Sequence, residues 1–224
     1  MWCVAAAREW WRCRRETRTE RGDSVFSPSQ ACGKTRGVRE VTLIRHGRPE
    51  LSRNVLLTAR DYEAWWKRYD ASGLRSGQVV PERIRTLVAH ADVVVSSPLP
   101  RAHASAVMAR EAEPDHTLAE LVEAPLPPPG LGPLKFRPLT WGTISRILWL
   151  SGRSAGQESA REAGARAAKA AEALEGLTQT HPSVCVFAHG WFNRMVGRQL
   201  RRRGWRCEEG RGDGYWSFRR YVKD

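Results

Sequence analysis

From Glu40 onward the chain alternates short runs of β-branched residues with longer segments of helical pattern, and this alternation constrains the fold more than any other feature. Three of the runs, at 41–44 (VTLI), 92–95 (DVVV) and 184–187 (VCVF), are apolar enough for strands that are buried on both faces. Helical segments separate these runs. The pattern predicts an α/β fold, a three-layer α/β/α sandwich with a mostly parallel central sheet.

Start and stop signals place the other elements. Thr58 is a typical N-cap residue with Asp61 in the following turn, and Pro81 opens a second helix. We expect helices over 58–69, 81–89, 101–111, 139–150, 156–177 and 191–203, and further strands over 116–122 and 214–221. The proline-rich segment 125–129 cannot continue a sheet ladder, so it should close the third strand.

Residues 1–38 differ from the rest of the chain. They are rich in Arg, Thr, Ser and Gly and contain Trp2, Trp10 and Trp11, but they show no sustained apolar period. We expect a disordered or weakly ordered basic extension over 1–38 and one folded domain over 39–224, which suits a chain of 224 residues. An arm that binds a membrane surface or RNA is the alternative for the extension.

The net charge of +13 would suit a nucleic-acid partner. Positive charge also concentrates small anionic substrates, and the arginines are scattered through helical segments rather than gathered into a stripe with aromatic residues. The dense run 201–203 (RRR) follows an apolar segment and is typical of a solvated helix end. We therefore expect no nucleic-acid partner.

Cysteine usage and apolar run length bear on location. The five cysteines are odd in number and form no C-x-x-C pair, which argues against a zinc ribbon and against a disulfide framework. A reducing, cytoplasmic location is expected. The apolar runs stay far below the ~20 residues of a membrane span, so we expect no membrane span.

Chemistry-bearing residues follow three of the apolar runs. They are Arg45-His46-Gly47 after the first run, Arg101 at the end of S-S-P-L-P-R after the second, and His189-Gly190 after the last. Ligands in open α/β sheets bind at the carboxyl ends of the strands, so two imidazoles and two guanidiniums should converge there. A phosphate would stabilise this cluster through charge-assisted hydrogen bonds, with Gly47 and Gly190 giving access to the backbone and to helix N-terminal amides.

The same residues argue against other ligands. The sequence has no G-x-x-x-x-G-K-[ST] motif for a nucleoside triphosphate. His46 and His189 lack a spaced set of Asp or Cys partners, and Arg45 would repel a cation. We expect neither a metal ion nor another cofactor.

Taken in order, R-H-G, S-S-P-x-x-R, a carboxylate after the third strand and A-H-G resemble the histidine phosphatase (phosphoglycerate-mutase-like) superfamily over roughly residues 40–221. The resemblance implies that the domain is catalytic and that His46 is a nucleophile that becomes transiently phosphorylated. It further implies that Arg45, Arg101 and His189 hold the phosphoryl group and stabilise its charge.

The resemblance also implies a general acid in an L-x-E pattern, which two glutamates match. Glu123, in L-V-E-A, would protonate the leaving oxygen and then activate water, and Glu120, in L-A-E, is its rival. In an extended strand the two side chains would point to opposite faces. Glu123 lies at the carboxyl end of the expected strand, so we predict that it is the acid.

The sequence departs from the family pattern after R-H-G. Many members continue with [EQ]-T-x-x-N, whereas here Arg48 follows and Ser52 stands where the asparagine would be. Either Asn54 or Arg48 is expected to make the missing phosphate contact. The L-x-E-x-x-x-G-x-x-x-G continuation of typical mutases is replaced by A-P-L-P-P-P after Glu123, which favours a phosphatase.

These features predict a cofactor-free phosphoric monoester hydrolase of the histidine acid phosphatase type. Its substrate would be a phosphorylated small molecule or a phosphoprotein. A phosphoglycerate-mutase-like phosphotransferase and a non-catalytic module for phospho-ligands or nucleic acid are the alternatives. Specificity is expected from segments 49–77 and 125–138, where the Trp65-Trp66 pair is more readily helix core than ligand contact.

Overall fold

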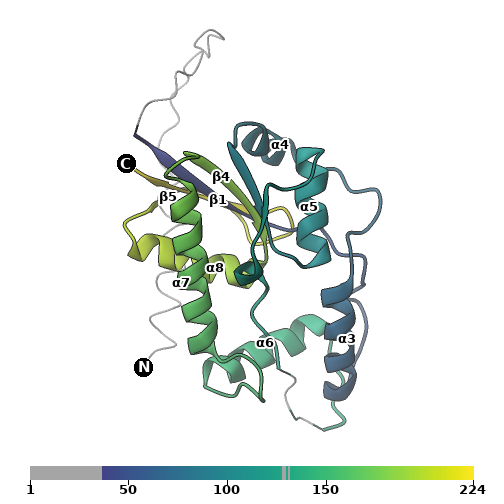
Figure 1. Ribbon diagram of the computed structural model, residues 1–224. Coiled ribbons are helices and arrows are strands. Elements are labelled where there is room, and N and C mark those ends of the chain that lie inside the picture. The colour runs from purple at the N-terminus through teal and green to yellow at the C-terminus, as the bar shows by residue number, and fades with distance from the viewer. Residues whose placement is uncertain (1–36, 128–129, 131) are drawn as a thin grey trace, which may run out of the picture. The chain divides into compact units, whose positions relative to one another are not determined.

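The computed structural model describes residues 37–127, 130 and 132–224 (Figure 1). Almost all of the predicted extension over 1–38 therefore lies outside the described residues. Residues Arg39–Lys223 form one folding unit, which contains the sheet and its helices. Among the helices of the described chain, none is long and apolar enough to cross a membrane.

Within the described residues, six strands form one sheet in the order β3-β2-β4-β1-β6-β5. Strands β1 (Arg39–Arg45), β2 (Val93–Ser96), β3 (His116–Thr117) and β4 (Ser183–Ala188) run parallel to one another. Strand β6 (Phe218–Lys223) runs antiparallel to both β1 and β5 (Arg206–Arg211). The predicted α/β class with a mostly parallel sheet is confirmed.

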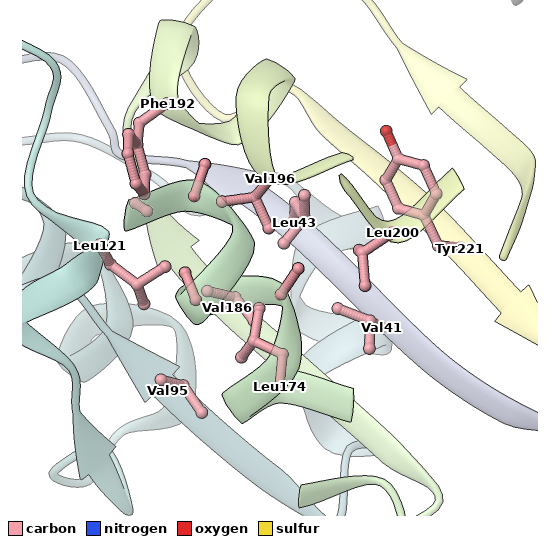
Figure 2. Close-up of a cluster of buried hydrophobic side chains, with 14 of the residues drawn as sticks. Val41, Leu43, Val95, Leu121, Leu174, Val186, Phe192, Val196, Leu200 and Tyr221 are labelled. Atoms are coloured by element: carbon pink, nitrogen blue, oxygen red, sulfur yellow. The ribbon is translucent and has the colours of Figure 1, made fainter. Parts of the chain in front are cut away.

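The strands bury alternate side chains against helices on both faces of the sheet. One face packs on α7 (Ala160–Leu177) and α8 (Gly190–Arg202) through Val41, Leu43, Val93, Val95, Val184 and Val186 (Figure 2). The other packs on α4 (Glu82–Ala89) and α5 (Pro100–Arg110) through Ile44, Val94, Cys185 and Phe187. Each fully buried aliphatic side chain stabilises the fold by about 1.5–3 kcal/mol. This double burial explains why the strands are apolar at successive positions.

Helices α3 (Ala59–Ala71) and α6 (Pro138–Leu150) form a third cluster that lies beyond the sheet in Figure 1. As predicted, Thr58 caps α3 in a capping box with Asp61. Aromatic rings of the two helices pack together, and the Trp141 indole donates to the Leu57 carbonyl at 2.7 Å. Trp65 is 5% exposed within this cluster, in agreement with its interpretation as helix core.

Two predicted strands were wrong in extent. The third strand was expected over 116–122, but β3 ends at Thr117 and a 3-10 helix follows at Ala119–Leu121. Arg166 donates to the carbonyls of Glu120 and Val122, which replaces sheet hydrogen bonding there. The late strand begins at Phe218 rather than at 214, and β5 was not predicted because its sequence, RCEEGR, is charged, as is common in edge strands.

Candidate active site

His46 follows β1 directly and is held by the backbone of β4. Its amide donates to the Ala188 carbonyl at 3.0 Å, and its side chain is 2% exposed. The imidazole Nδ1 lies 2.7 Å from the Gly47 carbonyl oxygen. Because a carbonyl can only accept, this contact assigns the proton to Nδ1 and leaves the lone pair on Nε2. The ring is thereby oriented with one nucleophilic nitrogen.

Arg101, in the first turn of α5, lies against that nitrogen. Its Nε donates to His46 Nε2 at 3.3 Å, and its side chain is 1% exposed. The rest of the guanidinium is fixed by the end of α3, since Nη1 donates to the Tyr69 carbonyl and Nη2 to Asp70 Oδ1, each at 3.0 Å. A buried guanidinium with these partners is a rigid positive group next to His46.

His189 ends the loop after β4 and caps α8. Its ring centroid lies 5.3 Å from that of His46, and its Nε2 is 2.9 Å from the hydroxyl of Ser97, which comes from the loop after β2. His189 Nδ1 is buried and, among the described residues, has no hydrogen-bond partner. With Ser97 donating to Nε2, this nitrogen carries a proton that an anion beside His46 can accept.

Both histidines are held in the neutral form. Burial, followed by the charges of Arg101 and Arg45, holds the pKa of His46 well below its usual range. Burial and the charge of Arg101, with a smaller effect of His46, do the same to the pKa of His189. A neutral His46 keeps its lone pair at physiological pH, which nucleophilic attack requires.

Arg45 is the fourth member of the polar cluster that it forms with His46, Arg101 and His189. Its Nη1 donates to the Asp213 carbonyl, and its Nε is buried without a partner among the described residues. A Cβ at position 190 would lie 3.1 Å from this Nε, so Gly190 makes room for the guanidinium. That Gly190 also admits a ligand to the backbone stays a prediction.

Backbone amides near Gly47 and Gly190 were expected to be free for a phosphate, but protein groups already accept hydrogen bonds from several of them. The Gly47 amide donates to Ser105 Oγ at 2.8 Å, and the chain continues as a loop until α3 begins at Ala59. At the N-terminus of α8, the Phe192 amide donates to the Glu123 carboxylate at 3.0 Å and the Trp191 amide at 3.4 Å. The protein's own carboxylate therefore occupies this helix end.

Glu123 and Glu120, the two candidate acids, lie in different cavities, although for a different reason than the one predicted. The segment is not an extended strand, so the argument from opposite strand faces does not apply. Glu123 is half-buried and lines the same cavity as Arg45. Glu120 lines a separate hollow with Arg166 and Lys169.

Arg53, which the sequence did not single out, contacts two aromatic rings beside the cluster. It donates to the Tyr69 hydroxyl, and its guanidinium lies 4.8 Å from the centre of that ring. The guanidiniums of Arg45 and Arg53 both lie against the Tyr215 ring, and burial followed by the charge of Arg53 lowers the pKa of Arg45. By contrast, Arg48 and Asn54 are exposed.

Tyr215 is a second residue that sequence reasoning missed. Its ring centroid lies 5.8 Å from that of His46, and the Arg45 and Arg53 guanidiniums lie 4.9 and 5.7 Å from the ring centre. The ring therefore covers the cluster on the side of a cavity that is lined by the loop 48–53. No sequence signal marks Tyr215, because it comes from the irregular segment before β6.

Another cavity, of about 460 Å³, opens beside the cluster. Arg45, Arg53 and Glu123 form one of its sides, and residues of α3, α6 and the start of α8 form the others. In the part of the chain that the structure describes, no three His, Cys, Asp or Glu side chains are grouped to hold a metal ion.

Solved structures of other proteins resemble this chain in fold. Mycobacterial hydrolase 2 shares the fold at 20% identity and a TM-score of 0.50, with 73% of this chain and 72% of that chain covered. Phosphoserine phosphatase from Entamoeba histolytica is 18% identical with a TM-score of 0.48 over 81% and 89% of the two chains. Mycobacterial glucosyl-3-phosphoglycerate phosphatase is 18% identical with a TM-score of 0.45 over 73% and 79%. At such identities these likenesses concern the fold alone.

The sequence comparison is more specific. No curated protein matches the sequence. A family model, that of the histidine phosphatase superfamily (branch 1), matches residues 41–206, which contain every member of the cluster except Tyr215.

Proposed function

The chain belongs to the histidine phosphatase superfamily, branch 1, and from this premise we propose that it hydrolyses phosphomonoesters through a phosphohistidine on His46. The observation that carries the proposal is the state of His46. Its ring is buried and neutral, and its Nε2 lone pair faces Arg101 with His189 and Arg45 close by. A neutral imidazole among cationic and donor groups suits attack on a phosphate dianion.

In the first step His46 Nε2 attacks phosphorus, and the bond between phosphorus and the ester oxygen breaks. The leaving oxygen takes a proton from Glu123, so the alcohol departs and the phosphoryl group stays on the ring. Arg45, Arg101 and the Nδ1 proton of His189 stabilise the negative charge on the three remaining phosphoryl oxygens.

The second step reverses the roles. A water molecule gives a proton to the Glu123 carboxylate and attacks phosphorus, and the bond to Nε2 breaks. Inorganic phosphate leaves, and His46 returns to its neutral form. Each step needs only the side chains, the ester and water, so the reaction requires no cofactor.

We assign to Arg53 the phosphate contact that an asparagine makes in many family members. Arg53 belongs to the loop after R-H-G, is half-buried, and reaches Tyr69 and Tyr215 beside the cluster. Arg48, which the sequence suggested, uses its backbone to bind the Gln78 side chain, and its own side chain is exposed. Asn54 is exposed as well.

The substrate is proposed to be a phosphorylated small molecule, and hydrolysis rather than phosphoryl transfer agrees with the proline-rich segment after Glu123. Cys185 is a buried free thiol, which suits the reducing, cytoplasmic location that the sequence predicts.

Turnover of p-nitrophenyl phosphate by the purified full chain tests the proposal. His46→Ala should lower kcat/KM by about a thousandfold or more, because the nucleophile is lost. His90→Ala is the matched control, since His90 is exposed at the end of α4. Wild-type protein that binds inorganic phosphate but turns over no ester would instead be a binding module, and full activity in His46→Ala would exclude the proposed nucleophile.

A further inference from the structure

The cavity of about 460 Å³ beside the cluster has two unlike sides. Arg45, Arg53 and Glu123 line the side where the proposed reaction takes place. Helix α6 lines another part of the cavity. A group attached to a phosphate at His46 through an oxygen near Glu123 can extend into this cavity. Its volume lies within the range of small-molecule sites, about 300–1,000 Å³.

The α6 side of the cavity is apolar and exposed. Leu139, Thr143, Ile147 and Leu150 follow one another at spacings of four, four and three residues, which places them on one helix face. Leu139 is 70% exposed, Ile147 62% and Leu150 48%. The opposite face of α6 is already buried through Trp141 and Trp149. Three large aliphatic side chains on one face beside a reaction centre mark a binding surface.

Indole rings complete the walls. Trp65 and Trp66 of α3 and Trp191 of α8 line the cavity. The Nε1 atoms of Trp65 and Trp191 are buried and, among the described residues, have no hydrogen-bond partner. The exposed parts of these flat rings give a hydrocarbon ligand apolar contact area.

Two further guanidiniums line the cavity, and protein groups hold both of them beside Glu123 and Arg45. Arg146 donates to the carbonyls of Ala124 and Pro125, and its guanidinium lies 4.8 Å from the centre of the Trp191 ring. Arg194 pairs with Asp213 at 2.9 Å. Both guanidiniums therefore lie on the side of the cavity next to the cluster, which leaves the α6 face of Leu139, Ile147 and Leu150 to an uncharged group.

From the apolar α6 face, the indole walls and the continuity with the cluster, we infer that the substrate is the phosphomonoester of a bulky, hydrocarbon-rich alcohol. Its phosphate lies at His46 and its apolar part lies along α6. The inference rests on the proposed function, which it deepens by naming the substrate class.

A series of n-alkyl phosphates from ethyl to octyl, used below their micelle concentrations, tests the inference. Each methylene that becomes buried should raise kcat/KM about fourfold, the equivalent of about 0.8 kcal/mol. If three of the six added methylenes are buried, octyl phosphate should exceed ethyl phosphate by about sixtyfold. Calorimetric binding of octylphosphonate and ethylphosphonate to the wild-type protein should show a preference of similar size without any turnover.

Two serine variants locate the effect. Ile147→Ser should lower the octyl-to-ethyl ratio by about tenfold, because a wall of the cavity becomes polar. Val79→Ser is the matched control, since Val79 is 76% exposed and lies away from the cavity lining. It should leave the ratio unchanged.

The outcomes separate this inference from the proposed function. Turnover that is equal for all chain lengths overturns the inference and leaves the hydrolase standing. Chain-length-dependent phosphonate binding without turnover of any ester supports the substrate class and overturns hydrolysis. A phosphopeptide that exceeds octyl phosphate tenfold in kcat/KM overturns the small-molecule class. A dimer that Ile147→Ser dissociates in analytical ultracentrifugation, with no chain-length effect, identifies the α6 face as an interface between copies.

Discussion

The two sides of the site are built differently. The phosphate side comes from short loops at strand ends. There, His46, Arg101 and His189 are buried and held by hydrogen bonds. The cavity side comes largely from α3 and α6, whose rings and aliphatic side chains line it together with Arg146. On the proposed function, the loops at the strand ends carry out the reaction, whereas the helices outside the sheet select the substrate. Changes on the first side should therefore affect all esters alike, and changes on the second should depend on the alcohol.

The largest effect is expected from Arg101→Met. Removal of a buried guanidinium beside the attacking nitrogen should lower kcat/KM about a thousandfold. Because Arg101 faces the phosphate side, ethyl phosphate and p-nitrophenyl phosphate should lose activity by equal factors. Steady-state kinetics with Arg85→Met, an exposed arginine of α4, as control would check this. Unequal losses of activity for the two esters would contradict the prediction that the phosphate side affects all esters alike.

A smaller, selective effect is expected where the two sides meet, at Glu123. An alkyl alcohol leaves poorly without a proton, so Glu123→Gln should slow turnover of ethyl phosphate about a hundredfold and that of p-nitrophenyl phosphate less than tenfold. Glutamine keeps an oxygen for the α8 amides, so the fold should persist. Glu120→Gln is the matched control and should lower both rates slightly and equally. If the selective loss occurs in the Glu120 variant, the two roles are reversed.

The smallest effect concerns stability rather than turnover. In the folded chain the pKa of His46 and of His189 is lowered well below its value in the unfolded chain. Between about pH 6.5 and pH 5 the two histidines therefore bind protons in the unfolded chain but not in the folded chain. Stability should therefore fall as pH falls, by up to about 2.7 kcal/mol per pH unit for the pair.

Urea unfolding at pH 7.0 and 5.5 measures this fall. The double variant His46→Gln, His189→Gln should lose much of the pH dependence, because only neutral groups remain at these positions. The cavity side carries no histidine, so Trp65→Phe should keep the wild-type dependence. An unchanged slope in the double variant would show that other groups control stability in acid.

Much of the fold could be predicted because β1, β2 and β4 are buried on both faces and therefore read as apolar runs. The same runs located His46, Arg101 and His189, since each follows a strand end. The extent of β3 could not be predicted, because the path of the chain after it depends on Arg166, which lies 44 residues after Val122 and 46 after Glu120. Arg53 and Tyr215 come from irregular segments whose paths are set by tertiary contacts, so sequence spacing could not place them.

The central claim, that His46 carries the phosphoryl group, is tested most directly by trapping the intermediate. Rapid mixing with a ³²P-labelled phosphomonoester and quenching at high pH preserves phosphohistidine, which is labile in acid. The account predicts label on the peptide that contains His46 and none in His46→Ala. Label on a serine or aspartate, or steady turnover without any labelled enzyme, would contradict it.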